Sequence, residues 1–161
     1  MRVGIGYDIH RFAEGRPLVI GGVEIPSVRG LDGHSDADVL LHAVIDALLG
    51  AIGAPDVGEQ FPTSDPTYAN ISSLRLLEQV ERLVTARGFV IQNIDATVVV
   101  QEPHLSPFKA AMAGHIQRTL HLGDGQVSVK AKTNEQLDAI GRGEGIAVYA
   151  VALVEQRQDS R

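Results

Sequence analysis

The sequence predicts an α/β (α+β) two-layer sandwich, in which one mainly mixed β-sheet is covered by helices. Two observations predict this fold class. Segments with apolar residues at helical spacing alternate with short apolar runs typical of strands, and both kinds are intermixed along the 161 residues. In addition, no repeat, low-complexity tract or linker divides the chain. We therefore expect a single domain over residues 1–156 and a polar C-terminal tail over residues 157–161.

Short apolar runs bounded by glycine, proline or polar turns predict the strands. The last of these runs, residues 146–154, is nearly all apolar, so this strand is expected to be covered on both faces. In chain order, the expected strands are residues 3–12, 18–20, 23–26, 89–100, 126–132 and 146–154.

The first helix is expected after a glycine-containing loop at residues 29–33. Ser35 marks its start, and Asp38 stands three residues later, a spacing compatible with a capping box. The helix runs through the apolar stretch 39–49 and is expected to stop at Gly50. The Gly- and Pro-rich loop that follows is about as long as structureless loops become, which is typical of functional loops.

Two further helices are expected. Residues 71–87 carry apolar side chains at helical spacing, and Gly88 is their expected terminator. Ser106 and Pro107 are a suitable N-cap and first-turn pair for a third helix. A short helical turn is expected after Thr133, where a capping box is an alternative to a ligand-binding role.

Composition limits the classes of partner. The formal charge of −6 argues against a nucleic-acid-binding face, which is usually basic. No apolar run approaches the roughly 18 to 20 residues that cross a bilayer, so no membrane association is expected. The chain contains no cysteine, which fits a cytoplasmic protein and means that a metal would be held by His, Asp or Glu.

The first candidate metal ligands are Asp8 and His10. If residues 3–12 form a strand, both side chains project from the same face, because side chains alternate with period two. A carboxylate and an imidazole placed in this way can bind one cation. Taken alone, such a pair is more often a polar pair that simply forms hydrogen bonds.

The first helix adds a polar stripe to an otherwise apolar segment. Asp38, His42 and Asp46 stand four residues apart and therefore share one helix face. A solvated stripe would more often contain Lys, Arg, Glu or Gln. Three nitrogen and oxygen ligands, from Asp8, His10 and His42, match the arrangement of catalytic zinc, with Asp46 or Asp38 able to orient His42. A polar cluster without metal stays open, as do Mn, Co or Fe(II) in place of zinc.

Further motifs follow these residues in order. They are GYDIH at 6–10, GHSDAD at 33–38 with His42, DVG at 56–58, FP at 61–62, DP at 65–66, VKAKTNE at 129–135 and GRGEGIA at 141–147. From about Arg2 to Val154, this set resembles the 2-C-methyl-D-erythritol 2,4-cyclodiphosphate synthase family. Several motifs that match together are far more specific than any one of them.

The resemblance implies a phosphorus–oxygen lyase of the non-mevalonate isoprenoid pathway. Such an enzyme converts 4-diphosphocytidyl-2-C-methyl-D-erythritol 2-phosphate to 2-C-methyl-D-erythritol 2,4-cyclodiphosphate and releases CMP. The nucleophile is the substrate's own 2-phosphate, so no nucleophilic side chain is required. The resemblance also implies a homotrimer with active sites between subunits, and leaves room for an isoprenoid diphosphate in the trimer cavity.

By resemblance, Asp8, His10 and His42 bind zinc, and Glu135 helps to hold a second cation, Mg²⁺ or Mn²⁺. The residues implied in catalysis are Asp8, His10, His34, Ser35, His42, Lys132, Thr133 and Glu135. The residues implied in substrate binding are Asp56, Gly58, Phe61, Asp65, Ala131, Lys132, Thr133 and Arg142.

Two positions depart from the family pattern. His104 stands where many relatives carry a lysine near the nucleotide, and Thr63 replaces a commonly acidic residue. Both differences affect the expected substrate contacts and leave the metal ligands untouched. Two alternative functions stay open: a metal-dependent phosphohydrolase, which would use water as nucleophile, and a non-catalytic trimeric module that binds isoprenoid diphosphates.

Overall fold

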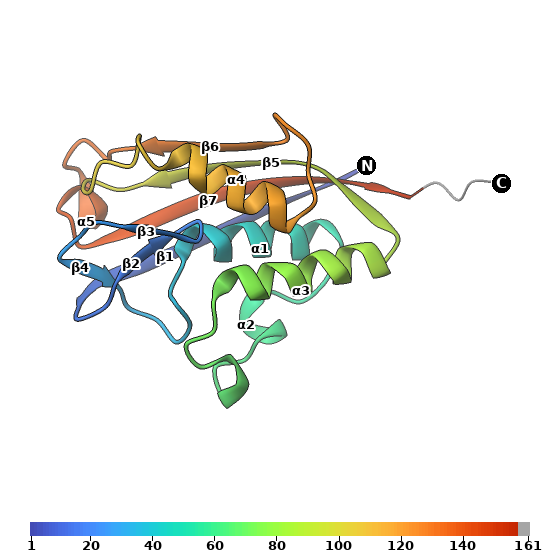
Figure 1. The fold of residues 1–161 in the computed structure, drawn as a ribbon, viewed down its shortest axis with the longest axis horizontal. Coiled ribbons are helices and arrows are strands. Elements are labelled where there is room, and N and C mark those ends of the chain that lie inside the picture. Colours follow the sequence, from blue (N-terminus) through green and yellow to red (C-terminus); the bar gives the residue numbers. More distant parts are fainter. Residues whose placement is uncertain (158–161) are drawn as a thin grey trace.

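The fold is a mixed β-sheet with helices packed on one face (Figure 1), in a computed structural model that describes residues 1–157. Within these residues, five strands form the main sheet in the order β4-β1-β7-β5-β6, and β2 pairs with β3 in a separate hairpin. In the main sheet, β5 and β6 pair in parallel, whereas the other neighbouring strands pair antiparallel. The strands are β1 (Arg2–Glu14), β2 (Leu18–Ile20), β3 (Val23–Ile25), β4 (Arg29–Leu31), β5 (Phe89–Val99), β6 (Val127–Lys132) and β7 (Gly145–Gln156).

The helices cover one face of this sheet. Figure 1 shows α1 (Val39–Ala51) nearest to the strands, with α3 (Ser73–Ala86) beyond it and α4 (Lys109–Thr119) alongside β6. The side chains of α1 are almost entirely buried, which explains why its sequence is apolar all round. The prediction of a mixed sheet covered by helices is therefore confirmed.

Two glycines allow α1 to lie directly on β1. A Cβ atom at Gly6 would come within 1.9 Å of the carbonyl oxygen of Ala43, and one at Gly4 within 2.0 Å of that of Ala47. Real Cβ atoms cannot approach so closely, so larger residues here would push the helix away from the strand. This close approach places the helix residue His42 beside the strand residues Asp8 and His10.

The last strand is buried on both sides over Gly145–Val148, as predicted, but beyond Val148 the second face of the sheet is open, which corrects the prediction there. Tyr149 and Val151 on β7 are 51% and 41% exposed, because β7 alternates between a helix-facing side and this second side. On β1, Ile5 is 71% exposed. We call this surface the open face, and its large apolar residues are Val3, Ile5, Tyr7, Ile9, Tyr149 and Val151.

Several predicted boundaries were wrong. Residues 29–31 form β4 rather than a loop, because they pair with the end of β1. The N-cap of α1 is Asp38 and not Ser35, since the Asp38 carboxylate accepts the backbone N–H of Leu41 at 3.0 Å. This helix continues past Gly50 to Ala51. The helix expected at 71–87 occupies Ser73–Ala86.

The long loop after α1 is more structured than expected. It contains the short helix α2 (Val57–Gln60) and a 3₁₀ turn, η1 (Pro66–Tyr68), which begin at the Asp56 and Asp65 N-caps. The turn expected after Thr133 is α5 (Asp138–Gly141), so the capping box considered there does not form. Likewise, α4 begins at Lys109 without a side-chain cap from Ser106.

At the C-terminus, the backbone N–H of Arg157 donates to the carbonyl of Gly88 at 2.7 Å. The rest of the expected polar tail, residues 158–161, lies outside the described residues. Across the described part of the chain, no helix combines the length and the apolar character needed to span a bilayer.

Candidate metal and substrate site

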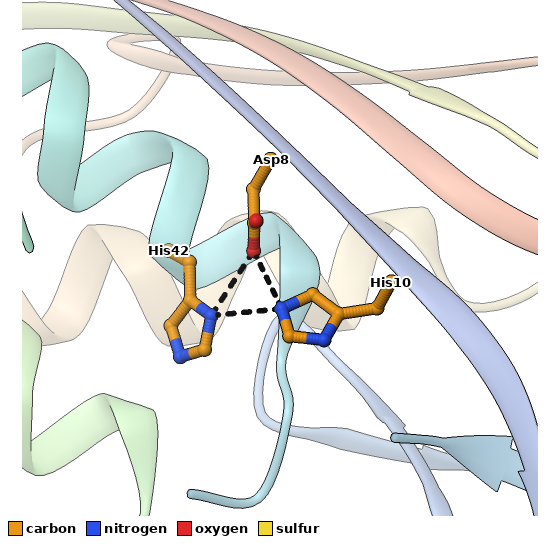
Figure 2. Close-up of side chains that lie close together, drawn as sticks. All are labelled: Asp8, His10 and His42. Carbon is orange, nitrogen blue, oxygen red and sulfur yellow. Dashed lines mark hydrogen bonds and ion pairs between the residues drawn. The ribbon is translucent and has the colours of Figure 1, made fainter. Parts of the chain in front are cut away.

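Three side chains from β1 and α1 converge beside the sheet (Figure 2). The Oδ2 atom of Asp8 lies 2.9 Å from Nε2 of His10 and 3.0 Å from Nδ1 of His42. The two ring nitrogens are 3.4 Å apart. The strand alternation and the helical position predicted from the sequence thus bring Asp8, His10 and His42 together as expected.

The donor atoms suit a small divalent cation. Zinc bonds of roughly 2.0–2.2 Å in tetrahedral geometry place neighbouring ligand atoms about 3.3 Å apart, close to the spacing found here. Burial alone would raise the pKa of Asp8, but hydrogen bonds from His10 and His42 hold it well below its usual range. Asp8 is therefore a carboxylate near neutral pH, the form that binds a metal.

Both imidazoles are held from their far side. Nδ1 of His10 lies 2.5 Å from the backbone carbonyl oxygen of Asp32 and donates its proton there. Nε2 of His42 lies 3.0 Å from the hydroxyl of Ser73 and 3.2 Å from that of Ser35. These contacts leave Nε2 of His10 and Nδ1 of His42 pointing at Asp8, which is what a shared cation requires.

The carboxylates of Asp38 and Asp46 have their hydrogen-bond partners elsewhere and not on the His42 ring, so the prediction that one of them orients this ring was wrong. Asp38 is fully buried and accepts backbone N–H groups from Gly21 and Gly22, in addition to capping α1. Burial raises the pKa of Asp38, although these N–H donors oppose the shift. Asp46 instead accepts the backbone N–H of Val57 at 2.7 Å. Of the three residues in the polar stripe, His42 therefore lies beside Asp8 and His10, whereas Asp38 and Asp46 anchor loops.

A cavity of about 160 Å³ opens beside the cluster. Four of the predicted site residues line it: His34 and Ser35 from the loop before α1, and Gly58 and Phe61 from the segment after it. Thr63, one of the two departures from the family pattern, also lines it. The remaining lining residues are His10, His42, Val57, Tyr68, Ile71 and Leu76.

Ala131, Lys132 and Thr133 line a different depression of about 100 Å³, together with His104. In the sheet register, Asp8 pairs with Val148 and Ala131 pairs with Val98, and these two partners pair with each other. Asp8 and Ala131 are thus separated by two intervening strands, or about 14 Å at the usual strand spacing. One chain does not bring the metal cluster and this depression together.

Three other predicted residues lie outside the metal cluster. Glu135 has a positive φ of 50° and accepts a hydrogen bond from Thr133 at 2.9 Å. Asp65 accepts the backbone N–H of Thr67 at 2.9 Å. Arg142 forms an ion pair with Glu144 at 2.7 Å.

Sequence reasoning assigned no role to three residues that shape the site. Ser73 contacts His42, and Asp36 contacts Ser73 at 2.5 Å. Arg16 donates to the backbone carbonyl groups of Gly33 and Ser35, and so holds the loop that carries His34. Asp36 stands inside the GHSDAD motif, and consecutive serines at the start of a helix are a capping signal, but neither pattern indicates a contact with His42.

Comparisons with known proteins identify the family of this chain. The model of the YgbB family matches residues 1–155. A protein from Pelotomaculum thermopropionicum named 2-C-methyl-D-erythritol 2,4-cyclodiphosphate synthase is 56% identical over 156 residues, or 97% of this chain and 96% of that protein. A protein of the same name from Syntrophus aciditrophicus is 53% identical over 159 residues, or 99% of this chain and all of that protein.

Solved structures show the same fold. Bifunctional IspDF from Campylobacter jejuni superposes with a TM-score of 0.94 at 43% identity, covering 99% of this chain and 43% of that protein. The Plasmodium falciparum IspF complex with CDP has a TM-score of 0.85 at 32% identity, covering 98% of this chain and 97% of that protein. The chain therefore belongs to the YgbB family and, with its relatives, to the 2-C-methyl-D-erythritol 2,4-cyclodiphosphate synthases.

Proposed function

We propose that this synthase works with a divalent metal, zinc in the first place, held by Asp8, His10 and His42. The observation that carries the proposal is the convergence of these three donor atoms beside a cavity lined by His34, Ser35 and Gly58. The reaction converts 4-diphosphocytidyl-2-C-methyl-D-erythritol 2-phosphate to the 2,4-cyclodiphosphate and CMP. An oxygen of the 2-phosphate bonds to the diphosphate phosphorus that is nearer the methylerythritol. The bond from that phosphorus to the oxygen of CMP breaks and CMP leaves, so no water is consumed.

Bound at this site, the metal polarises the phosphate under attack and offsets its negative charge. The protein's own residues supply alignment, because an intramolecular displacement needs the two phosphates held close together. Asp56, Gly58 and Phe61 belong to the loop that ends at the cavity, where they hold the methylerythritol unit. The backbone carbonyl of Asp32 and the hydroxyl of Ser73 keep the two imidazoles turned toward Asp8.

The nucleotide half of the substrate is assigned to Ala131, Lys132 and Thr133, and Asp65 and Arg142 are further substrate-binding residues. Ala131, Lys132 and Thr133 line a depression of about 100 Å³. Pro103 and His104 line it as well. Glu135 would help to hold a second cation, Mg²⁺ or Mn²⁺, which would offset the charge of the diphosphate. The CDP named in the Plasmodium falciparum complex is the nucleotide part of this substrate, which supports the assignment.

A homotrimer is the assembly that unites these two sets of residues. Two intervening strands separate Asp8 from Ala131 within one chain, so a neighbouring subunit supplies the nucleotide contacts. The open face provides the surface for assembly, since large exposed apolar patches mark interaction sites. Its Tyr7 and Tyr149 rings already contact each other at 5.0 Å between centroids. The isoprenoid diphosphate in the trimer cavity stays a prediction.

The decisive experiment is product analysis by mass spectrometry after incubation of the protein with the cytidyl substrate, zinc and magnesium. Equal amounts of CMP and cyclodiphosphate are expected, and His42→Ala should lose both. His121→Asn is the matched control, because His121 is exposed outside the site and has a positive φ, which Asn tolerates. Release of inorganic phosphate would favour a phosphohydrolase, whereas intact substrate with folded, zinc-loaded protein would favour a binding module.

A further inference from the structure

A chain of hydrogen bonds runs from Asp36 through Ser73 to His42. Ser73 is the first residue of α3 and is completely buried. Its Oγ atom lies 2.5 Å from Oδ1 of Asp36 and 3.0 Å from Nε2 of His42. Its backbone N–H also donates to Oδ2 of Asp36 at 2.9 Å. The carboxylate therefore contacts two groups of one serine, on the side of His42 that faces away from Asp8.

The chemistry of these groups fixes the direction of each hydrogen bond. A carboxylate can only accept, so the Ser73 hydroxyl donates its single proton to Asp36. The hydroxyl oxygen can then only accept from the imidazole, which requires a proton on Nε2 of His42. In a neutral imidazole, a proton on Nε2 leaves the lone pair on Nδ1. Nδ1 is the nitrogen that points at Asp8 and His10.

We infer that Asp36 and Ser73 are positioning residues that hold His42 in the ring tautomer and orientation required by the metal. This inference rests on the proposed metal role of His42. The relay is needed because Asp8 lies 3.0 Å from Nδ1 and, without a metal, favours a proton on that nitrogen. The Ser73 hydroxyl donates its proton to Asp36 and can only accept from Nε2–H of His42, so it opposes a proton on Nδ1. The ring of His10 is held in its tautomer by the backbone carbonyl of Asp32, which accepts the proton on Nδ1.

Ser35 alone cannot fix the tautomer. Its hydroxyl lies 3.2 Å from Nε2 of His42 and accepts the backbone N–H of Ala37, which leaves its own proton free to turn. Ser35 can therefore either donate to His42 or accept from it. Only the hydroxyl of Ser73 has its proton committed to a carboxylate, and this difference assigns the selective role to the Asp36–Ser73 pair.

The relay also depends on how α3 docks against the loop before α1. The backbone N–H of Asp36 donates to the carbonyl of Ile71 at 3.1 Å, and that of Asn70 donates to the carbonyl of His34 at 3.0 Å. Asp36 serves as the acceptor at the α3 N-terminus, since the Ser72 side chain makes no capping bond. A purely structural role for Asp36 would therefore stabilise α3 without affecting the metal.

The variant Ser73→Ala separates these two roles. It keeps the backbone N–H that Asp36 accepts, and it removes only the hydroxyl that contacts His42. Asp36→Asn is the second variant, because an amide that accepts from the Ser73 N–H turns its NH₂ group toward the hydroxyl and reverses the relay. Ser72→Ala is the matched control, since it removes an exposed hydroxyl one residue away.

Two quantities should be measured on all four proteins. The first is the zinc dissociation constant from competition with a chromophoric chelator, after melting curves of the metal-free proteins have verified their fold. Ser73→Ala and Asp36→Asn should each weaken zinc binding at least about tenfold, the usual effect of losing such a partner, and Ser72→Ala should not. The second is the ¹⁵N NMR spectrum of the zinc-loaded protein, which reports ring N–H groups directly.

In that spectrum, the Nε2–H signal of His42 should be protected from exchange in the wild type and lose its protection in both relay variants. The Nδ1–H signal of His10 should stay unchanged in every protein, because its acceptor is a backbone carbonyl. If the zinc affinity and the His42 signal of Ser73→Ala and Asp36→Asn both equal those of the wild type, this inference is overturned and the metal proposal stands. A wild type that binds no zinc would overturn the metal proposal and this inference with it.

Discussion

The carboxylate of Asp46 accepts a 2.7 Å hydrogen bond from the backbone N–H of Val57. Asp46 follows His42 by one turn of α1, and Val57 lies between the substrate-loop residues Asp56 and Gly58. A single side chain thus fixes the distance between the helix that carries His42 and the loop that borders the cavity. The region around His42 and the loop that carries Gly58 are therefore connected directly through Asp46 of α1.

This connection predicts that Asp46→Ala loosens the substrate loop without removing the metal. Hydrogen bonds to charged groups contribute roughly 1.5–3 kcal/mol, so KM for the cytidyl substrate should rise on the order of tenfold. Steady-state kinetics and a zinc assay on the same sample check both parts. Asp46→Asn keeps an oxygen acceptor and should recover most of the affinity. An unchanged KM in Asp46→Ala would show that the loop does not depend on this bond.

The contact between α1 and β1 predicts a strong effect of Gly6→Ala. The added Cβ would collide with the Ala43 carbonyl, so unfolding free energy should fall by about 1–3 kcal/mol, the usual cost of overpacking. Zinc affinity should fall as well, because His42 moves with the helix. Gly50→Ala is the control: an added Cβ there meets only the Ile5 carbonyl at 3.9 Å, and alanine favours the helix. Denaturant unfolding of both variants makes the comparison.

The pair formed by Asp8 and His10 predicts a pH window of stability for the metal-free protein. The pKa of Asp8 is lowered from 3.8, so its contribution is present above pH 3.8 and is lost as the pH falls further. Burial alone would lower the pKa of His10, but the hydrogen bond with Asp8 raises it above 6.5. The His10 contribution is therefore complete below pH 6.5 and is lost as the pH rises through the folded pKa.

The stability difference between the wild type and Asp8→Asn should consequently be largest between pH 3.8 and 6.5 and should shrink on both sides. Chemical unfolding at a series of pH values, with a chelator present, measures it. A difference that stays constant from well below pH 3.8 to well above pH 6.5 would mean that the two side chains do not interact in the metal-free protein.

The open face predicts that assembly depends on Ile5. A charge at this exposed position in the first part of β1 would have to be desolvated at the subunit contact, so Ile5→Glu should yield a monomer of unchanged fold. Analytical ultracentrifugation should find a trimer for the wild type. Val28→Glu adds the same charge at a residue that is 93% exposed outside the open face, and it should remain trimeric. A trimeric Ile5→Glu protein would place the interface elsewhere.

Local periodicity was sufficient to predict which three side chains converge beside the sheet. Alternation along residues 3–12 places Asp8 and His10 on one face, and the otherwise apolar helix makes His42 conspicuous. The same reasoning misjudged Asp38 and Asp46, because a shared helix face does not specify which groups a carboxylate meets. Their actual partners, the backbone of Gly21, Gly22 and Val57, come from loops whose paths no local pattern indicates.

The sequence by itself determined the mixed α/β class, the family and the convergence of Asp8, His10 and His42, since these depend on spacing within single elements and on matched motifs. Only the tertiary structure decided which face of β7 stays open and which groups turn the two imidazoles. Asp36 lies just before α1, which carries His42, but Ser73 begins α3, 37 residues after Asp36, so the contact of the three arises from the packing of α3 against α1. Hydrogen bonds between distant segments depend on that packing, and periodicity carries no information about it.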